Sequence, residues 1–211
     1  MIRRSKPTRA LLIAMLLCVA LPAAINAADR SPLETKPATT TPLNQNLLLN
    51  PGFEQVGTGA TIPGWAASGD VHVETFGTRA WPTQAYANTW NGGRRYLACG
   101  KVAGMVSQTV NFTGSSTRTT TLLARLNADF GGTIGHSVRV AIRITGSPSQ
   151  AVSKDKVKVV EITNSYRKAV TTLPVPTWAT HIQASVQLMP KAGAAKCRVV
   201  ADTVSLSVIQ G

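Results

Sequence analysis

Residues 137–145 have the sequence Ser-Val-Arg-Val-Ala-Ile-Arg-Ile-Thr, in which every second residue is a branched aliphatic one. Successive side chains of a β-strand point to opposite faces, so a period of two predicts a strand with one buried face. The buried face of this segment would carry Val138, Val140, Ile142 and Ile144. Its other face, towards solvent, would carry Arg139, Ala141 and Arg143.

Four further segments repeat this period of two. Their apolar sets are Ile182, Ala184, Val186 and Leu188; Leu122, Ala124 and Leu126; Val106, Val110 and Phe112; and Val204, Leu206 and Val208. Clusters of Gly, Pro and Ser separate these segments, as turns between strands do. No segment after residue 27 has a convincing helical period. The pattern therefore predicts an all-β fold of two packed antiparallel sheets, a β-sandwich.

The first 27 residues have the features of a secretory signal peptide. Basic residues between Arg3 and Arg9 form a positive region, and an uninterrupted apolar run follows over residues 10–21. This run is too short for an ordinary transmembrane helix, and no later stretch is long and apolar enough to be one. We therefore expect cleavage near Ala27, no transmembrane segment afterwards, and a secreted protein that is extracellular or lies in the cell envelope.

The rest of the chain divides into two parts. Residues 28–45 are rich in Pro and Thr and lack apolar periodicity, which is typical of a flexible tether. Residues 46–211 remain for the β-sandwich binding domain, and a segment of about 165 residues suits one domain with a sizeable core. We find no internal repeat in the sequence.

The chain is strongly basic. It carries 22 Lys and Arg residues against 9 Asp and Glu, and four of the basic residues leave with the signal peptide, so 22 − 4 − 9 gives a mature net charge of +9. Such a balance favours anionic surfaces or polymers as partners. The charge is scattered and forms no long run, so binding of nucleic acid is permitted but not indicated.

Two cysteines, Cys99 and Cys197, remain once Cys18 leaves with the signal peptide. An even number of cysteines in an exported protein predicts a disulfide, and two buried free thiols are the alternative. The bridge would close a loop of about 100 residues, worth about 4–5 kcal/mol in the chain-entropy model. It would tie the C-terminal strand to the body of the domain.

Three short motifs follow one another along the chain. They are NLLLNPGFE at residues 46–54 with PGW at residues 63–65, VSQTV at residues 106–110, and DTVSL at residues 202–206. In this order they resemble the galactose-binding-like jelly rolls, which include many secreted carbohydrate-binding modules. The resemblance covers roughly residues 46–209 and implies a jelly-roll β-sandwich with a carbohydrate ligand.

The resemblance also implies a structural calcium ion. In similar modules the glutamate that ends the first motif and the aspartate that opens the last, here Glu54 and Asp202, often bind calcium together with backbone carbonyls. Calcium takes several oxygen ligands, which adjacent first and last strands can supply. Thr203 stands where relatives often carry another acid or an amide, and this departure lowers the available charge. The alternative is that Glu54 caps a turn and Asp202 accepts hydrogen bonds from backbone amides.

The sequence contains no recognisable catalytic constellation. The nine acids and three histidines are spread out, and none of the spacings of zinc proteases, serine hydrolases or phosphate-binding loops is present. Asp70 and Glu74 could pair as acid and base, but exposed alternate positions of a strand explain them more simply. Asp129 and His136 flank a Gly-Gly loop, and a solvated loop explains them equally well. We therefore expect that the protein is not an enzyme.

A first candidate ligand surface consists of three large aromatic residues, Trp81, Tyr86 and Trp90. They lie in the polar segment 79–95, which lacks apolar alternation. Aromatic faces that stack on sugar C–H groups, or that make cation–π contacts, would account for them. The alternative is that the loop folds back and buries them as a small satellite cluster.

A second candidate surface follows from the strand alternation. Six polar residues oppose the core-facing positions of their segments: Arg125, Asn127, Arg139, Arg143, Gln183 and Gln187. If these strands share a sheet, the side chains form a polar, basic face like the cleft of similar jelly-roll modules. Arginine binds carboxylates and sulfates in a bidentate manner, and a neutral glycan offers neither group. The alternative is an ordinary solvated outer face.

These observations favour a secreted, non-catalytic carbohydrate-binding module whose partner is an anionic polysaccharide. The main alternative is a structural or adhesive protein of the cell envelope or extracellular space, which would use the same sandwich for contacts with envelope proteins. A third, weaker hypothesis is a small hydrolase whose acids converge only in the folded chain.

Overall fold

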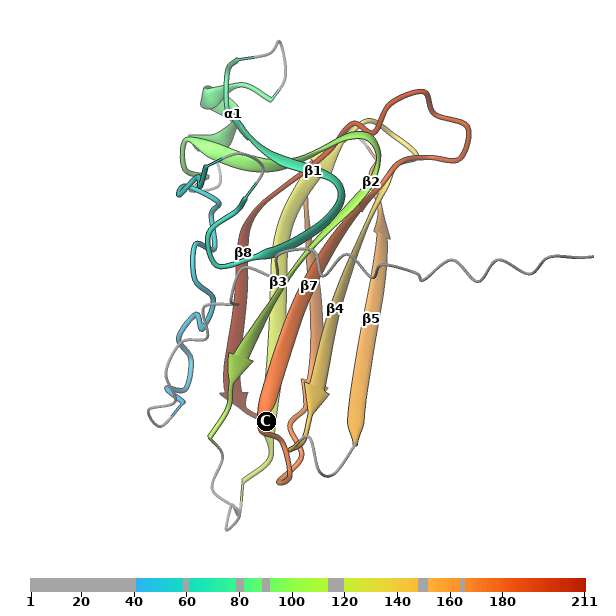
Figure 1. The fold of residues 1–211 in the computed structure, drawn as a ribbon. Helices are drawn as coiled ribbons and strands as arrows, with labels where there is room; N and C mark the ends of the chain where they lie inside the picture. Colours follow the sequence, from blue (N-terminus) through green and yellow to red (C-terminus); the bar gives the residue numbers. More distant parts are fainter. Residues whose placement is uncertain are drawn as a thin grey trace, which may run out of the picture. The chain divides into compact units, whose positions relative to one another are not determined.

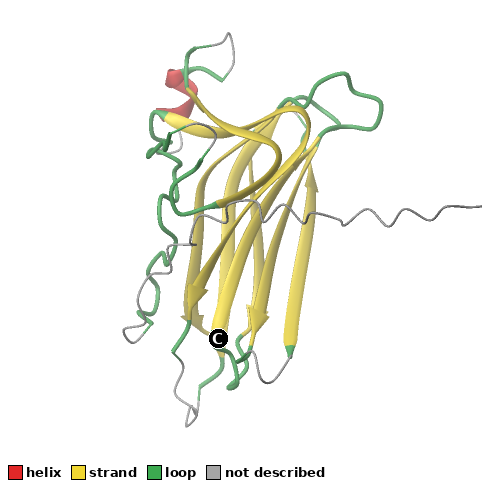
Figure 2. Ribbon diagram, in the orientation of Figure 1, coloured by secondary structure: helices red, strands yellow, loops and turns green. Residues whose placement is uncertain are grey.

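Strands make up almost all of the regular structure in the computed structural model of the chain (Figures 1 and 2). The structure describes residues 41–58, 61–78, 82–88, 92–113, 120–147, 152–163 and 166–211, which all belong to one compact unit. The predicted signal peptide and most of the predicted tether lie outside the described residues. Within the described part of the chain, no helix has the length and apolar character needed to cross a membrane.

The described elements are eight strands and one short helix. In chain order they are β1 (Ala66–Thr75), α1 (Gln84–Asn88), β2 (Arg95–Asn111), β3 (Leu122–Gly132), β4 (Ser137–Thr145), β5 (Ser153–Glu161), β6 (Arg167–Pro174), β7 (His181–Met189) and β8 (Val199–Gln210). All five segments with a period of two are strands, namely β2, β3, β4, β7 and β8. Asp70 and Glu74, interpreted from the sequence as alternate positions of a strand, lie on β1. The sequence pattern did not predict β5, β6 or the five-residue α1, which is too short to show a period.

Strand β2 turns the sheet from one layer of the sandwich to the other. The strand order is β5-β4-β7-β2-β8-β3-β6, with β1 beside β2, and every pair is antiparallel. Leu97 and Ala98 of β2 pair with β8, whereas residues 104–111 pair with β7. The edge strands β5 and β6 approach each other, so the sheet curls into a nearly closed jelly roll. The predicted all-β jelly-roll sandwich is confirmed.

The core lies inside this roll. The four aliphatic side chains of β4 that face inward are fully buried, and so are the four of β7: Val138, Val140, Ile142, Ile144, Ile182, Ala184, Val186 and Leu188. Burial of one large aliphatic side chain contributes about 1.5–3 kcal/mol, so these two strands supply a large part of the driving force for folding. Their other faces are left to point outward.

Gln108 of β2 joins the first motif to the sheet, although it lies on the core face between Val106 and Val110. Only 3% of its surface is exposed. Leu49 N donates to Gln108 Oε1 at 2.6 Å, and Gln108 Nε2 donates to Leu49 O at 3.1 Å and to the carbonyl of Gly64. The buried amide therefore satisfies three backbone groups of a segment that has no strand of its own.

Replacing Gln108 with alanine should destabilise the domain by about 2–3 kcal/mol, because partly buried backbone groups of Leu49 and Gly64 lose their partners. Urea denaturation at equilibrium would measure this difference. Gln183→Ala, on the outward face of neighbouring β7, is the matched control and should stay within about 0.5 kcal/mol of the parent protein. Equal stability of the two variants would contradict the role given to Gln108.

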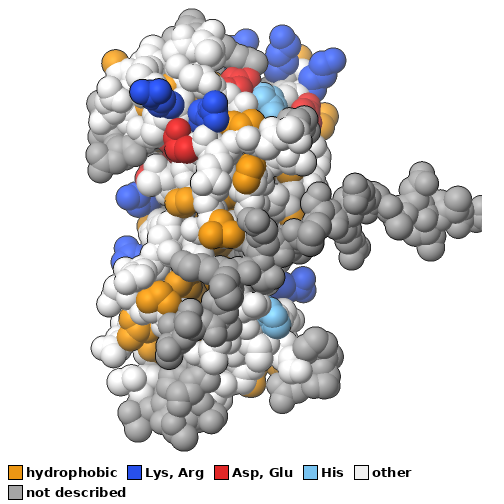
Figure 3. All heavy atoms as spheres, turned by 60° about the vertical axis from the view of Figure 1, so that its left-hand side comes forward, with side chains coloured by type: hydrophobic (Ala, Val, Ile, Leu, Met, Phe, Trp, Pro, Cys, Tyr) orange, Lys and Arg blue, Asp and Glu red, His pale blue; other side chains and the backbone are white. Residues whose placement is uncertain are grey.

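Positive charge is spread over the surface but gathers at one end. Figure 3 shows Lys and Arg side chains at the upper end of the molecule, with Asp, Glu and His side chains among them. The scattered charge expected from the sequence is thus uneven in three dimensions, because the fold brings distant basic residues to the same end.

Candidate functional site

Four of the predicted polar residues meet on the outward face of β4 and β7. Arg139 pairs directly across the strands with Gln187, and Arg143 pairs with Gln183. Directly paired residues of antiparallel strands point to the same side of a sheet. The aliphatic neighbours of these residues face the core, so the two Arg–Gln pairs face outward together.

A row of small side chains separates the two Arg–Gln pairs. Ala141 of β4 pairs with Ser185 of β7 and with Val157 of β5. The small side chains leave a groove of about 280 Å³, here called the outer groove, lined by Met105, Arg139, Ala141, Ile142, Arg143, Asp155, Val157, Gln183, Ser185 and Gln187. Beyond Arg143 a second hollow of about 460 Å³ extends it towards His181.

The two arginines of the outer groove differ in their electrostatic surroundings. Arg143 Nε lies 3.2 Å from Asp155 Oδ1, in an ion pair whose two side chains are both about half exposed. An exposed pair of this kind adds little to stability. Arg139 Nη1 donates to Gln187 Oε1 at 3.4 Å and has no ion pair with any described residue. Arg139 is therefore the groove cation that an anionic ligand reaches without displacing an acid.

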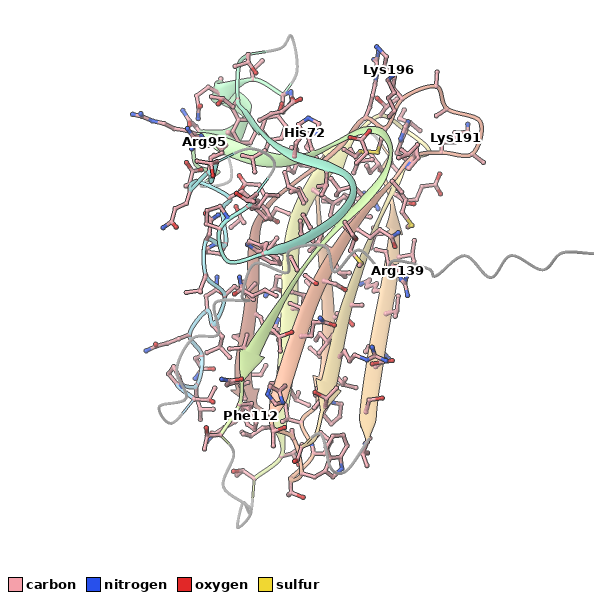
Figure 4. The ribbon with its side chains drawn as sticks, viewed as in Figure 1. His72, Arg95, Phe112, Arg139, Lys191 and Lys196 are labelled. Carbon is pink, nitrogen blue, oxygen red and sulfur yellow. A yellow bond between two sulfur atoms is a disulfide. The ribbon has the colours of Figure 1, made fainter. Side chains whose placement is uncertain are left out.

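Arg125 and Asn127 do not join this groove. Both lie on β3, which β2 and β8 separate from β7 in the strand order. Asn127 Nδ2 donates to Ser205 Oγ of β8 at 3.1 Å. Figure 4 shows Arg139 on the side of β4 that adjoins β5, away from β3. The six predicted residues therefore form two separate groups, of four and of two.

None of the three aromatic candidates has a described side chain. Trp81 and Trp90 lie outside the described residues. Tyr86 lies in α1, and its side chain is also outside the described part. Trp65, by contrast, packs in the core against Phe53 with ring centroids 5.4 Å apart, and its Nε1 donates to Asn50 O at 3.1 Å.

Glu54 and Asp202, the two acids of the predicted metal site, lie close together. Glu54 Oε1 accepts from Arg95 N at 3.1 Å, and Asp202 Oδ1 accepts from Thr203 N at 2.6 Å. Asp202 is fully buried, and its second oxygen, Oδ2, has no hydrogen-bond partner among the described residues. A buried carboxylate oxygen without a partner is costly, so this position calls for a proton or a cation.

Glycines surround the two carboxylates. A Cβ on Gly92 would lie 2.9 Å from Asp202 Oδ2, and one on Gly93 would collide with the Glu54 carboxylate. Phe53 and Thr203, beside the two acids, both have positive φ values, of 56° and 50°. Non-glycine residues rarely adopt this conformation, and such strain is typical of a backbone shaped around a ligand.

The surroundings of Asp202 favour its protonated form when no cation is bound. Burial, together with the nearby charges of Glu54 and Asp129, raises the pKa of Asp202 to about 7, although the bond from Thr203 N opposes the shift. Burial also raises the pKa of Asp129, which Lys168 partly offsets from 3.6 Å. A divalent cation between Glu54 and Asp202 would remove this penalty.

This pair of carboxylates fits a hard cation bound largely by oxygen. No group of three or more His, Cys, Asp or Glu side chains that could hold a metal occurs in the described residues. Backbone carbonyls would therefore have to complete the coordination, which calcium accepts more readily than zinc does. The hydrogen bonds of Glu54 and of Asp202 Oδ1 agree with the alternative of local capping, but that alternative does not explain Asp202 Oδ2.

The predicted disulfide is present. Cys99 and Cys197 are bonded, with Cα atoms 5.5 Å apart, and both are buried. The bridge joins β2 to the segment that leads into β8, as expected. It connects residues 98 positions apart.

Two simpler interpretations from the sequence are wrong. Glu74 is not one of the exposed alternate positions of a strand, since only 13% of its side chain is exposed. One carboxylate oxygen accepts from Tyr96 Oη at 2.7 Å, and the other lies 2.8 Å from His72 Nε2. His136 is likewise buried, and its Nδ1 accepts from Lys191 N at 3.4 Å. Tyr96 and Lys191 are distant in the chain, so no local pattern indicated these two contacts. His72 and Glu74 are alternate residues of β1 and share a face, which is the one local signal for their contact.

Comparisons with known proteins are informative only at the level of structure. No protein-family model matches the sequence, and no curated protein does so either. Among solved structures, the carbohydrate-binding module TmCBM61 in complex with β-1,4-galactotriose is 19% identical, with a TM-score of 0.52 over 79% of this chain and 99% of that chain.

Enzymes also share the fold. The Stig cyclase Fisc from Fischerella sp. TAU is 15% identical, with a TM-score of 0.54 over 79% of this chain and 98% of that chain. Tailspike protein 4 of bacteriophage CBA120 is 13% identical, with a TM-score of 0.51 over 78% of this chain and 21% of that chain. At these identities the likeness establishes the fold, which carbohydrate-binding modules and cyclases have in common with this chain.

Proposed function

We propose that this chain is a secreted, non-catalytic carbohydrate-binding module that holds an anionic polysaccharide in the outer groove. The observation that carries the proposal is the arrangement of two Arg–Gln pairs on either side of the small Ala141–Ser185 row. Amides bond to sugar hydroxyls, and guanidinium groups bond to carboxylates or sulfates. The groove offers both kinds of group on one face, and the fold is one that known carbohydrate-binding modules use.

The length of the groove suits a polymer. Arg143 lies four positions after Arg139 on β4, so a rise of about 3.4 Å per residue puts their Cα atoms roughly 14 Å apart. A single sugar ring does not span this distance. The continuation of the groove towards His181 extends the contact surface along the same strands.

The charges of the groove support binding and not catalysis. Asp155 is the acid among the described residues that line the groove, and it is paired with Arg143. Glycoside hydrolysis ordinarily uses two carboxyl groups across the scissile bond. The basic character of the whole chain would steer an anionic polymer towards the groove, and added salt would weaken this attraction.

Replacing Arg139 with alanine should weaken binding to uronic or sulfated glycans about 10- to 100-fold, since a hydrogen bond to a charged group contributes about 1.5–3 kcal/mol. Arg143→Ala should have a smaller effect, because Asp155 already engages that side chain. A glycan array at two salt concentrations would identify the ligand, and calorimetry would measure the affinities.

Arg125→Ala on β3 is the matched control, because it removes the same charge from an exposed position outside the groove. Binding should change less than about twofold in this variant. Equal losses of affinity in Arg125→Ala and Arg139→Ala would contradict the outer groove as the binding site. Binding would then rest on non-specific charge attraction.

The alternative function has one specific observation in its favour. Val157 and Val159 on edge strand β5 are 42% and 56% exposed, next to the outer groove. Exposed aliphatic side chains on an edge strand suit a protein partner. An array without any bound glycan, together with capture of an envelope protein that Val159→Asp abolishes, would favour the structural or adhesive function.

We also propose that Glu54 and Asp202 hold a structural calcium ion with nearby backbone carbonyls. The observation behind this is the buried, unpartnered Asp202 Oδ2 beside a second acid. The ion would compensate the charge of the two carboxylates and join the first motif to β8. Neither Glu54 nor Asp202 lines the outer groove, so the ion would act on stability.

A further inference from the structure

Another hollow, larger than the outer groove, lies away from it. It has a volume of about 740 Å³ and is formed by the ends of β1, β2, β3 and β8 that lie close to the disulfide. Functional ligand pockets commonly fall between about 300 and 1,000 Å³. No residue lines both this hollow, here called the end pocket, and the outer groove. Its lining includes His72, Glu74, Tyr96, Lys101, Lys196 and Arg198.

Residues with small or no side chains form the floor of the end pocket and leave its space open. Ala98, Gly100 and Gly132 line it. A Cβ on Gly132 would lie too close to Arg198 O, and a Cβ on Gly100 would collide with the Asp70 carboxylate. A side chain at Gly132 would displace the backbone of Arg198 and Val199, whereas one at Gly100 would displace the Asp70 side chain. The backbone of the fold therefore sets the floor at Gly132.

Three cations stand around this floor. Lys101, Lys196 and Arg198 are exposed and line the pocket, and none of them makes an ion pair with a described residue. Lys196 and His72 both lie at the upper end of the molecule in Figure 4, well apart from Arg139. The Asp70 carboxylate accepts a hydrogen bond from Lys101 N but forms no ion pair with the three cationic side chains. These side chains can therefore attract an anionic group, and arginine can bind its oxygens in a bidentate manner.

The disulfide holds two of these cations in place. Lys196 and Arg198 flank Cys197 in the sequence, and the Cys99–Cys197 bond ties this segment to β2. Cys197 N donates to Gly100 O at 3.1 Å, and Thr133 N donates to Arg198 O at 3.0 Å. The segment with Lys196 and Arg198, here called the basic wall, is therefore attached to two strands by its backbone. This attachment lowers the conformational cost of binding.

The opposite wall presents a histidine in a defined orientation. Glu74 lies between His72 and Tyr96 and hydrogen-bonds with both. Because His72 Nε2 faces Glu74, the other ring nitrogen, Nδ1, is the one left for a ligand. Pro82, Val200 and the Tyr96 ring also line the pocket, and because all three are buried only small apolar parts of them reach it. A ligand that fits must combine an anionic group, a hydroxyl and an apolar face.

We propose that the end pocket is a second carbohydrate site, which takes one sugar residue bearing a carboxylate or a sulfate. The basic wall binds the oxyanion, His72 Nδ1 bonds to a hydroxyl, and the Pro82–Val200 side contacts the C–H face of the ring. The inference rests on the proposed function, because it gives the module a second site for the same class of ligand. One protein then binds two stretches of polysaccharide, which raises its avidity.

The test uses a protein whose outer groove is disabled by Arg139→Ala and Arg143→Ala. The probes are glucuronic acid and glucose 6-sulfate, with glucose as the neutral control, and binding is followed by shifts of backbone amide signals in NMR titrations. We expect both anionic sugars to shift amides of residues 96–101 and 196–200. Adding Lys196→Ala and Arg198→Ala should weaken this binding tenfold or more. Lys156→Ala with Lys158→Ala, which removes the same charge from exposed positions of β5, should change it less than twofold.

Several results would overturn the second site. Glucose binding as well as glucuronic acid would remove the role of the basic wall, and inorganic sulfate binding as tightly as glucose 6-sulfate would show a simple anion site. Absence of shifts at residues 196–200 would exclude the pocket altogether. A different result would reject the outer groove alone. Arg139→Ala would then leave the affinity for an acidic oligosaccharide unchanged, while the anionic sugars would still shift the amide signals of the end pocket.

Discussion

Replacing Cys99 and Cys197 together with serine should lower the melting temperature by roughly 10–20 °C. The bond closes a loop with a sequence separation of 98 residues. In the chain-entropy model, opening such a loop costs about 4–5 kcal/mol, and each kcal/mol corresponds to about 2–4 °C for a domain of this size. Differential scanning calorimetry of the two proteins would measure the shift.

The same variant separates a stabilising role of the bond from a role in binding. At a temperature where the variant remains folded by circular dichroism, affinity at the outer groove should be unchanged. Affinity at the end pocket should fall, because Lys196 and Arg198 lose their covalent attachment to β2. A melting temperature within about 3 °C of the parent protein would contradict the expected contribution of loop closure.

The second large effect concerns Asp202. In the presence of a chelator, the wild-type protein should lose roughly 4 kcal/mol of stability between pH 4 and pH 7, and added calcium should restore it at pH 7.5. The pKa of Asp202 is raised to about 7 from its usual value of 3.8, so the span 7 − 3.8 at 1.36 kcal/mol per pH unit gives this magnitude.

The sign follows from proton binding. Between the two pKa values the folded state holds the proton of Asp202 and the unfolded state does not, so the stability of the metal-free protein falls as pH rises. Above about pH 7 the buried carboxylate is charged in both states, and the loss is complete. Calcium replaces the proton as the compensating charge, so binding becomes tighter as pH rises through this range.

Asp202→Asn should abolish both effects. In the presence of a chelator, the melting temperature of this variant should lack the fall between pH 4 and pH 7 that Asp202 causes in the wild-type protein. Added calcium should no longer raise the melting temperature of the variant. Asp155→Asn, an exposed acid on β5, is the matched control and should retain the calcium response. If calcium and chelator leave the wild-type melting temperature unchanged at pH 7.5, while magnesium does the same, Glu54 and Asp202 have a purely local role.

Sequence periodicity was sufficient for strands that have one buried face. In β4 and β7 each alternate residue meets either the core or water, and this contrast appears directly as a period of two. In β5 the contrast is missing. Lys154, Lys156 and Lys158 pair with the core-facing residues of β4, yet they are exposed because β5 lies at the edge of the sheet, beyond the core. Charged side chains there also discourage pairing with another chain.

The sequence by itself determined the all-β class, the jelly-roll resemblance and the disulfide. Each depends on local alternation, short motifs or residue counts, which the chain expresses without reference to its neighbours. It also identified the two acids at the ends of the domain and the polar faces of β4 and β7.

Only the tertiary structure decided which of these polar residues act together. The pairing of β4 with β7 puts Arg139 and Arg143 on a face with Gln183 and Gln187. The path of β2 between the two layers carries β3, with Arg125 and Asn127, away from that face. The same path brings His72 and Glu74 opposite Arg198 around the end pocket. Strand order and the curl of the sheet depend on contacts between residues far apart in the chain, and no local pattern of side chains encodes those distances.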